Sequence, residues 1–158
     1  MRIFTRLLIV AGIAGSILSV AQAQMLSFSK KPNAEQMECL RQLLSRSSWK
    51  DSPSLLSEMF SIAQVATAVL DDKWNTDYVY IFEGFNWCGT AGCKLLIGEL
   101  RRRGVCHLLY EAAGDTVFTV LRRRDHGYRR LYTPCEARFD GHQYQQFHED
   151  CPNVDVRR

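Results

Sequence analysis

Six cysteines in a chain of 158 residues constrain the fold more than any other feature of the sequence. Two of them, Cys88 and Cys93, flank the four small residues Gly89-Thr90-Ala91-Gly92. Small residues with two glycines allow a tight chain reversal that brings the two sulfur atoms together. The spacing therefore predicts a Cys88–Cys93 disulfide. It does not match the Cys-x-x-Cys motif of thioredoxin-type redox sites.

A zinc site is the competing interpretation, because the chain also contains four histidines. Structural zinc sites use ligands in closely spaced pairs, and no second pair accompanies Cys88 and Cys93. The histidines are scattered along the chain at His107, His126, His142 and His148. The sequence also has no phosphate loop and no dinucleotide-binding fingerprint. We therefore expect no metal and no other cofactor.

The N-terminus has the three parts of an export signal. Arg2 and Arg6 are positive, residues 7–20 form an apolar run, and Ala21 and Ala23 are the small residues that a signal peptidase requires. We expect cleavage between Ala23 and Gln24, with residues 1–23 as the signal peptide. The apolar run is shorter than the roughly 20 residues of a membrane helix. The mature protein is therefore expected to be periplasmic or secreted and to have no membrane span.

Removal of the signal peptide changes the charge of the chain. The mature protein keeps 18 Lys and Arg against 17 Asp and Glu, a net charge of +1. A nearly neutral chain gives no argument for nucleic-acid binding. All six cysteines remain, and an even number of cysteines in an exported protein indicates a disulfide framework.

Helical patterns occupy the first part of the mature chain. Residues 24–32 are polar and predict a flexible leader. Asn33 precedes Gln36 by three residues, which is typical of a capping box. The apolar residues Met37, Leu40, Leu43 and Leu44 then predict a helix that ends near Ser47. A second short helix is expected from Ser52-Pro53 to Met59.

Strand-like patterns follow from Ile62 onward. Tyr78, Tyr80 and Phe82 alternate with Val79 and Ile81, so both faces of this strand are apolar or aromatic. Turns are expected at 101–104 and 122–127, and Asp140-Gly141 predicts a two-residue hairpin. The expected strands are 62–70, 78–82, 94–100, 105–110, 116–121, 128–132, 135–139 and 142–147. These elements predict an α+β fold, with one or two N-terminal helices packed on an antiparallel meander of about seven strands. The single domain covers 33–150, and a C-terminal tail covers 151–158.

The meander order also favours two further disulfides. Cys106 and Cys135 begin strands at opposite ends of the sheet, about one strand length or 17–20 Å apart. A disulfide requires Cα atoms within about 7 Å, so these two cysteines do not pair. Cys151 follows a strand that runs back toward Cys135. We therefore predict the pairs Cys135–Cys151 and Cys39–Cys106.

The segment from Tyr80 to Ile97 resembles a loose group of exported bacterial proteins. These proteins carry a Cys-Gly-Ser/Thr-Gly-Gly-Cys loop between two strands, and Ala91 here replaces one of the usual glycines. An acidic turn, Asp71-Asp72, and the run from Asp140 to Tyr144 occupy comparable places, so the similarity covers roughly residues 62–146. The resemblance implies an envelope location and a β-rich domain. It implies no reaction.

Two arginine triplets are candidates for binding an anion or a partner. They fall in turns that the meander places at the same end of the sheet, and they would form one cationic rim. The residues are Arg101, Arg102, Arg103, Arg122, Arg123 and Arg124. Guanidinium groups bind phosphates and carboxylates bidentately, so the partner would be an envelope protein or an anionic polymer. The alternative is that these charges are solvated, partly neutralised by acids such as Glu99, and keep the sheet soluble.

No catalytic constellation is evident. Cys106 and His107 are adjacent in sequence but point to opposite faces of a strand. The pairs Asp125-His126 and Glu149-Asp150 lie in a turn and in the tail, and no Gly-x-Ser-x-Gly motif is present. The aromatic residues Trp74, Phe85 and Trp87 either complete a small core or grip a partner.

These observations favour a non-enzymatic binding protein of the envelope, of inhibitor or immunity type. A rigid loop lowers the entropy cost of binding, which suits such a role. One alternative is a cell-wall-acting enzyme or accessory subunit. Another is a structural envelope protein that contacts anionic lipid.

Overall fold

The structure, a computed structural model, describes residues 24–146 except 30, 72, 74, 90–91, 115–117 and 134. The predicted signal peptide and C-terminal tail lie outside these residues. The elements are, in chain order, β1 (Gln24–Met25), α1 (Ala34–Leu44), α2 (Pro53–Ile62), β2 (Ala63–Ala68), β3 (Thr76–Phe82), β4 (Cys88–Gly89), β5 (Gly92–Arg101), the 3-10 helix η1 (Arg102–Gly104), β6 (Val105–Gly114), β7 (Thr119–Asp125), β8 (Tyr128–Thr133), β9 (Cys135–Phe139) and β10 (Tyr144–Gln146).

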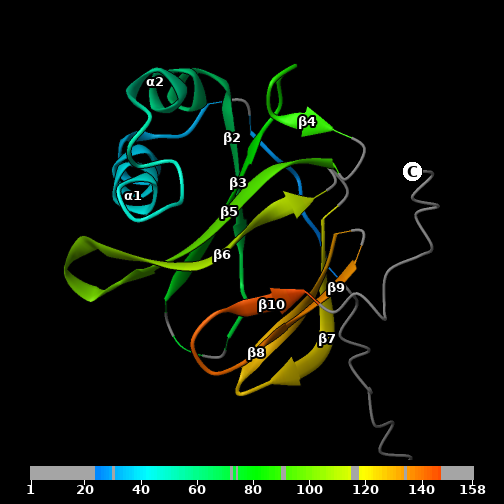
Figure 1. The fold of residues 1–158 in the computed structure, drawn as a ribbon. Coiled ribbons are helices and arrows are strands. Elements are labelled where there is room, and N and C mark those ends of the chain that lie inside the picture. The colour runs from blue at the N-terminus through cyan, green and yellow to red at the C-terminus, as the bar shows by residue number, and fades with distance from the viewer. Residues whose placement is uncertain are drawn as a thin grey trace, which may run out of the picture.

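The strands form two antiparallel sheets (Figure 1). The first sheet has the order β2-β3-β5-β4, with β6 also paired to β5, and both helices lie on one side of it. We call it the helix-covered sheet. The second sheet has the order β1-β7-β8-β9-β10. The predicted α+β class is confirmed, and the meander divides into two sheets between β6 and β7.

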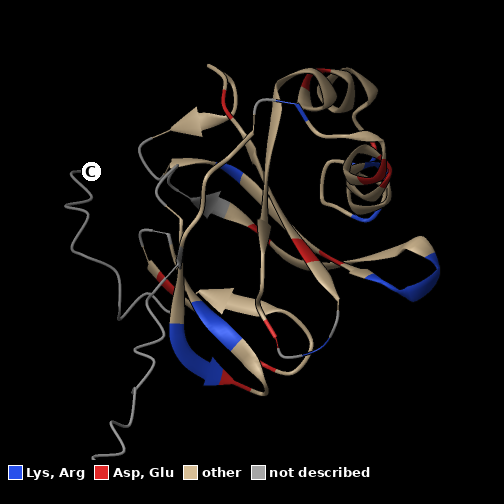
Figure 2. Cartoon of the chain, turned by 180° about the vertical axis from the view of Figure 1, so that it is seen from behind, with Lys and Arg blue, Asp and Glu red and all other residues tan. Residues whose placement is uncertain are grey.

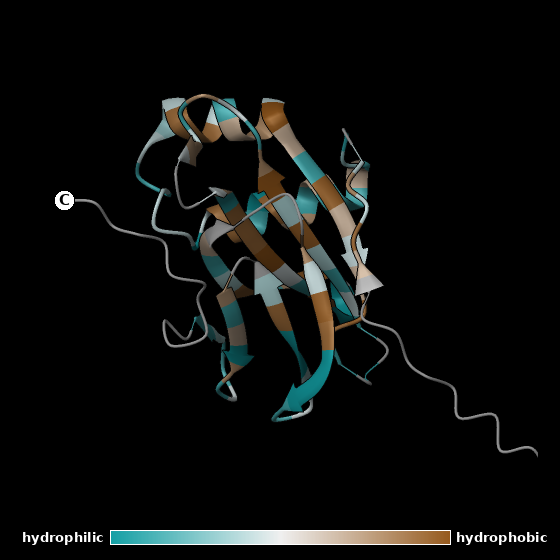
Figure 3. Ribbon diagram, turned by 90° about the vertical axis from the view of Figure 1, so that its right-hand side faces the viewer, coloured by the Kyte–Doolittle hydropathy of each residue, from teal (hydrophilic) through white to brown (hydrophobic). Residues whose placement is uncertain are grey.

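Strand β3 shows why the helix-covered sheet is buried on both faces. Tyr80 and Phe82 pack in a cluster with Leu40 and Leu43 of α1. The intervening residues, with Val79 as an example, pack in a second cluster that includes residues of the second sheet. Successive strand residues point to opposite faces, so an apolar run in both registers indicates a central strand. Figure 3 shows hydrophobic positions along the interior strands.

Helix α1 is fixed at its start and along its buried face. Its first turn has the predicted capping box, because the Asn33 side chain accepts from the Gln36 amide and the Gln36 side chain accepts from the Asn33 amide, both at 2.9 Å. A disulfide joins Cys39 of α1 to Cys106 of β6, one of the predicted pairs. The helix also approaches β5 closely, since a Cβ atom on Gly98 would lie 2.6 Å from Leu43 Cδ1.

Residues 24–29 differ from the predicted flexible leader. Gln24 and Met25 pair with β7, and Leu26 is buried in the core between the sheets. Ser29 then forms a bridge with Val65 of β2. The segment contains the apolar residues Met25, Leu26 and Phe28, and the burial of Leu26 together with backbone hydrogen bonds to two strands holds it in place. This contact was not visible in the composition.

Several element boundaries also differ from the expectation; among them, helix α2 continues to Ile62 instead of ending near Met59. Strand β6 continues to Gly114, and Arg122–Arg124 lie in β7 rather than in a turn. The turn is confined to His126 and Gly127, which both have positive φ. The Asp140-Gly141 hairpin has four loop residues, because Phe139 pairs with Tyr144. The Asp140 side chain accepts hydrogen bonds from the amides of residues 142 and 143, and these bonds stabilise the four-residue loop.

Candidate functional site

The Cys88–Cys93 disulfide fixes the base of a loop that we call the aromatic loop, residues 83–94. Cys88 pairs directly with Cys93 across β4 and β5, with 3.8 Å between their Cα atoms. Before the disulfide, the chain turns tightly because the amides of Trp87 and Cys88 both donate to the Gly84 carbonyl at 3.0 Å. The Lys94 amide donates to the Trp87 carbonyl at 2.8 Å. Covalent and backbone bonds therefore hold the base of the loop.

Trp87 anchors the aromatic loop in the core. It is buried and contacts Phe82, while the ring of Trp49 packs against it edge-on with 6.1 Å between centroids. Lys94 lies over the Trp49 ring at 5.6 Å. Trp87 therefore completes the core, the structural role that the sequence left open beside partner binding. Trp74 lies outside the described residues.

Phe85 has the opposite environment two residues earlier. Its exposure is 101% of the reference value, the highest among the exposed large hydrophobic residues of the described chain. A single exposed apolar residue on a surface needs no explanation of its own. Here, however, the ring stands on a turn that is followed by the buried Trp87 and the disulfide-linked Cys88. The structure thus exposes an aromatic ring to solvent on a loop whose base is held by a disulfide and by backbone hydrogen bonds.

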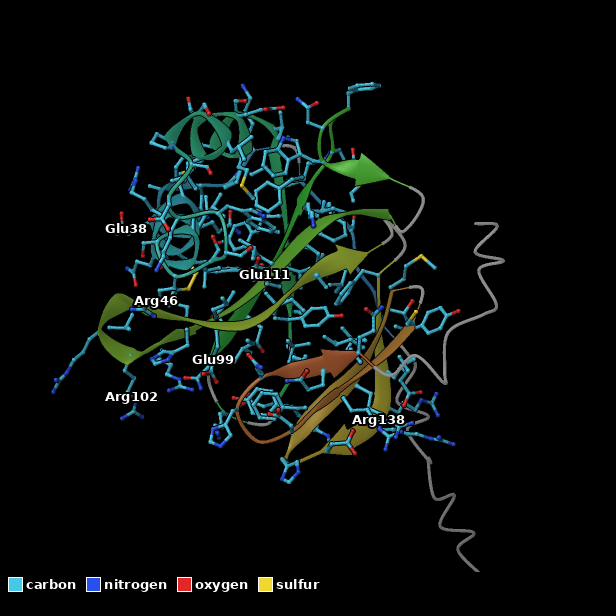
Figure 4. All side chains as sticks on the ribbon, viewed as in Figure 1. Glu38, Arg46, Glu99, Arg102, Glu111 and Arg138 are labelled. Atoms are coloured by element: carbon cyan, nitrogen blue, oxygen red, sulfur yellow. A yellow bond between two sulfur atoms is a disulfide. The ribbon has the colours of Figure 1, made fainter. Side chains whose placement is uncertain are left out.

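The two arginine triplets lie on separate hairpins. Arg101–Arg103 occupy the tip of the β5–β6 hairpin, which projects from the body, and Figure 4 shows Arg102 directed away from it. Arg122–Arg124 lie on β7 of the second sheet. Figure 2 shows these two blue segments well apart. The single cationic rim expected from one continuous meander is therefore replaced by two basic surfaces.

Part of this charge is neutralised locally. Arg101 donates through Nε to Glu99, one of the acids expected to do so. Arg124 donates to the Gly127 carbonyl at 2.9 Å, which closes the β7–β8 turn. Arg102, Arg103, Arg122 and Arg123 are exposed. Arg103 also has φ of 70°, a left-handed conformation that is uncommon for residues other than glycine.

The residues considered for catalysis either take part in structural interactions or are exposed without a catalytic partner among the described residues. Cys106 is disulfide-bonded and offers no thiolate. Both carboxylate oxygens of Asp125 accept from Arg130, at 2.6 and 3.0 Å, while His126 is exposed on the turn. Burial, followed by the charge of Arg101, lowers the pKa of His107. Glu149-Asp150 and the predicted partner of Cys135, Cys151, lie outside the described residues.

Three buried carboxylates form a cluster that sequence reasoning missed. Asp71, Asp77 and Glu99 are each no more than 2% exposed, and Figure 4 shows Glu99 between the two sheets. Glu99 accepts from Tyr128 at 2.8 Å and from Asn75 at 2.9 Å, in addition to Arg101. The cluster therefore links β5 to β8 of the second sheet. Acids inside the apolar segments 76–82 and 92–101 are the sequence signal that could have revealed it.

Burial and hydrogen bonding shift the pKa values of these acids in different directions. Desolvation is the main cause that raises the pKa of Asp77 to about 7. A hydrogen bond from the Leu70 amide lowers this pKa, whereas the negative charges of Asp71 and Glu99 raise it further. Desolvation likewise raises the pKa of Asp71. Burial acts on Glu99 too, but hydrogen bonds from Tyr128, Arg101 and Asn75 outweigh it and lower the pKa of Glu99. The cluster thus combines an anionic Glu99 with acids that hold protons more tightly.

The cluster serves chiefly to join the two sheets. Besides the Tyr128–Glu99 bond, the Arg129 amide donates to the Leu70 carbonyl at 2.7 Å. Within the described residues, no three His, Cys, Asp or Glu side chains are arranged to hold a metal ion. Its acids are also buried too deeply to meet a large substrate directly.

Comparisons with known proteins add no relative. No family model matches the chain, and neither a curated protein nor a solved structure shows significant similarity to it. Among the described residues, no helix is long and apolar enough to cross a membrane.

Proposed function

We propose that this chain is an exported, disulfide-stabilised binding protein of the cell envelope that acts without catalysis, as an inhibitor or immunity-type protein. The observation that carries the proposal is Phe85, which is fully exposed on a loop whose base is fixed. Phe85 would insert into an apolar pocket of a partner protein. The export signal predicted from the sequence and the framework of cysteines support the envelope as the compartment.

The physical argument rests on the low cost of binding through this loop. A binding surface loses affinity when loops and side chains must be ordered on association. The aromatic loop is already ordered by its disulfide, by the Gly84 turn and by buried Trp87. A phenyl ring then contributes a large apolar area and only two rotatable bonds, which is typical of energetic hot spots.

The experiment is a quantitative pulldown with envelope crosslinking under non-reducing conditions, followed by affinity measurement for the captured partner. Phe85→Ala should weaken binding at least about thirtyfold, the effect of a hot-spot residue. Val69→Ala is the matched control, because Val69 is also an exposed apolar residue at 54% but lies away from the loop. Equal affinity of the wild type and Phe85→Ala would refute the role of Phe85.

The basic hairpin tip supports a second candidate function, contact with anionic lipid. Arg102 and Arg103 project on the β5–β6 hairpin, where Arg103 holds a left-handed conformation. Vesicles of phosphatidylglycerol, but not of phosphatidylcholine, should then bind the protein in a salt-sensitive way. The Arg102→Ala/Arg103→Ala variant should lose this binding, whereas Arg122→Ala/Arg123→Ala should keep it. Binding that both double variants retain would exclude the hairpin tip.

A further inference from the structure

The N-terminal segment shows how the space between the two sheets is closed on one side. Residues Gln24 and Met25 pair with β7, and the Leu26 amide donates to the Phe118 carbonyl at 3.1 Å. Ser29 exchanges two backbone hydrogen bonds with Val65 of β2, at 2.8 and 3.1 Å. An extended segment of only six residues therefore connects an edge strand of each sheet. It continues the hydrogen bonding from β7 to β2.

The opposite side has the same two kinds of edge, and none of the described residues forms such a connecting segment there. Within the described residues, β6 pairs only with β5, and β10 pairs only with β9. Figure 1 shows β6 and β10 as neighbours across the space between the sheets. A groove of about 390 Å³ lies between them. Its lining residues are Leu108, Tyr110, Glu111, Ala112, Gln143, Tyr144, Gln145 and Gln146.

Tyr110 gives this groove a polar group that lacks a partner. The side chain is 5% exposed, and its hydroxyl has no hydrogen-bond partner among the described residues. A bulge in β6 leaves Leu109 without a paired residue on β5 and places Leu109 and Tyr110 in the same core cluster. A buried hydroxyl without a partner destabilises the free protein, so a ligand that bonds to it recovers that free energy.

The charge of the groove favours a cationic residue in the ligand. Among the described residues that line the groove, Glu111 is the only charged one. Its two carboxylate oxygens accept from the Ser48 amide at 3.1 Å and from the Ser48 hydroxyl, so the carboxylate is held in place. Gln143, Gln145 and Gln146 add neutral amides that both donate and accept hydrogen bonds. An arginine or lysine beside Glu111 would complement the groove.

We propose that the groove between β6 and β10 binds an extended segment of a partner polypeptide that carries a basic residue. The segment adds as a strand to one of the two edges, as residues 24–29 do on the other side. Bulges and charges commonly protect sheet edges from such pairing. Here the bulge in β6 instead directs an unpartnered Tyr110 toward the core side of the strand, and the adjoining groove leaves room for a ligand.

The test uses the full chain with intact disulfides and a phage-displayed library of random peptides of about eight residues, the length of a typical longer strand. Enriched peptides should alternate in polarity and carry Arg or Lys. Gln145→Trp fills the groove and should reduce peptide affinity at least about tenfold. Thr67→Trp, at an exposed position of β2, is the matched control and should bind like the wild type.

Two further measurements separate strand addition from other binding. Tyr110→Phe should weaken peptide binding about tenfold while leaving the free protein at least as stable, because the removed hydroxyl has no partner in it. Bound peptide should slow hydrogen exchange of the amides in 108–112 or 144–146. Phe85→Ala should change neither result, which keeps this site distinct from the aromatic loop.

The proposal is overturned by any of three results. The first is that no peptide binds the wild type better than Gln145→Trp. The second is that peptides bind without slowing amide exchange in either strand, which would identify a pocket for side chains only. The third is a dimer that Gln145→Trp dissociates, which would identify a second copy of this chain as the occupant.

Discussion

The two faces of the helix-covered sheet are built differently. The face under the helices is aromatic and aliphatic, and the Cys39–Cys106 disulfide closes it. Its buried tyrosines reach hydrogen-bond partners, since Tyr80 donates to the Gln36 carbonyl at 2.6 Å and Tyr78 donates to Glu35. The face toward the second sheet also has an aliphatic core, but it includes three buried carboxylates and borders an open groove.

Unsatisfied polar atoms occur on both faces but are more numerous toward the second sheet, since on the helix face the indole N–H of Trp87 is buried without a hydrogen-bond partner among the described residues. On the face toward the second sheet, Asp71, Asp77 and Tyr110 each bury an oxygen that has no hydrogen-bond partner among the described residues. Buried polar atoms without a partner are rare in folded proteins, so each of them calls for an explanation. We infer that the helix face mainly provides stability, and that the face between the sheets carries the groups whose state can change.

The largest expected effect comes from opening the helix face. The Cys39→Ala/Cys106→Ala variant removes a crosslink over a sequence separation of 67 residues. Loop-closure entropy then predicts a loss of about 4 kcal/mol in the free energy of unfolding. Urea unfolding monitored by tryptophan fluorescence measures it.

The other described disulfide provides the control. Cys88→Ala/Cys93→Ala removes a crosslink with a separation of only 5 residues, and the same relation predicts a loss of about 2 kcal/mol. If the short loop proves the more important of the two, the helix face is not the stabilising half of the molecule.

Much of the fold was predictable because its determinants are local. The capping box at Asn33 and the alternation in 78–82 each depend on residues that are close in sequence. The division into two sheets was not predictable, since it depends on which edges meet. The same is true of residues 24–29, whose backbone hydrogen-bond partners lie in two strands that are distant in the sequence.

The candidate surfaces show the same division. The aromatic loop was recognisable from Cys88 and Cys93. That Phe85 is exposed while Trp87 is buried against Trp49 depends on tertiary packing, which the local sequence does not reveal. The arginine triplets were visible in sequence, while their separation required the sheet topology. Likewise, β6 and β10 lie far apart in the chain, so the groove between them had no local signal.

The second effect concerns protonation on the face between the sheets. Folding raises the pKa of Asp77 from 3.8 to about 7, so the folded state holds this proton more tightly. Its contribution to stability is therefore complete below about pH 4 and is lost as the pH rises toward 7. The loss is of the order of 1 kcal/mol for each pH unit in this window.

Asp77→Asn tests this assignment because the amide stays neutral and keeps an oxygen for the Leu70 amide. The free energy of unfolding, measured across pH 4–8, should fall with pH in the wild type relative to Asp77→Asn. Asp51→Asn, at an exposed position, should follow the wild type. Parallel curves for the wild type and Asp77→Asn would show that folding does not raise the pKa of Asp77.

A third, smaller effect returns to the helix face. Gly98→Ala places a methyl group 2.6 Å from Leu43 Cδ1, which should destabilise the protein by about 1–3 kcal/mol. Leu43→Ala alone leaves a cavity and costs about 2–5 kcal/mol. In the double variant the added methyl has room, so its total cost should be less than the sum of the two single costs. Additive costs would mean that α1 does not press on β5 at Gly98.

The smallest effect is expected at Phe85, and it sharpens the distinction between stability and binding. A fully exposed ring contributes almost no burial to the folded state, so Phe85→Ala should change the free energy of unfolding by less than about 0.5 kcal/mol. Trp87→Ala, two residues away, should cost about 3–5 kcal/mol because that ring is buried against Phe82 and Trp49. Urea unfolding of both variants checks this contrast. A large loss of stability in Phe85→Ala would assign the ring to the fold and leave the aromatic loop without its binding residue.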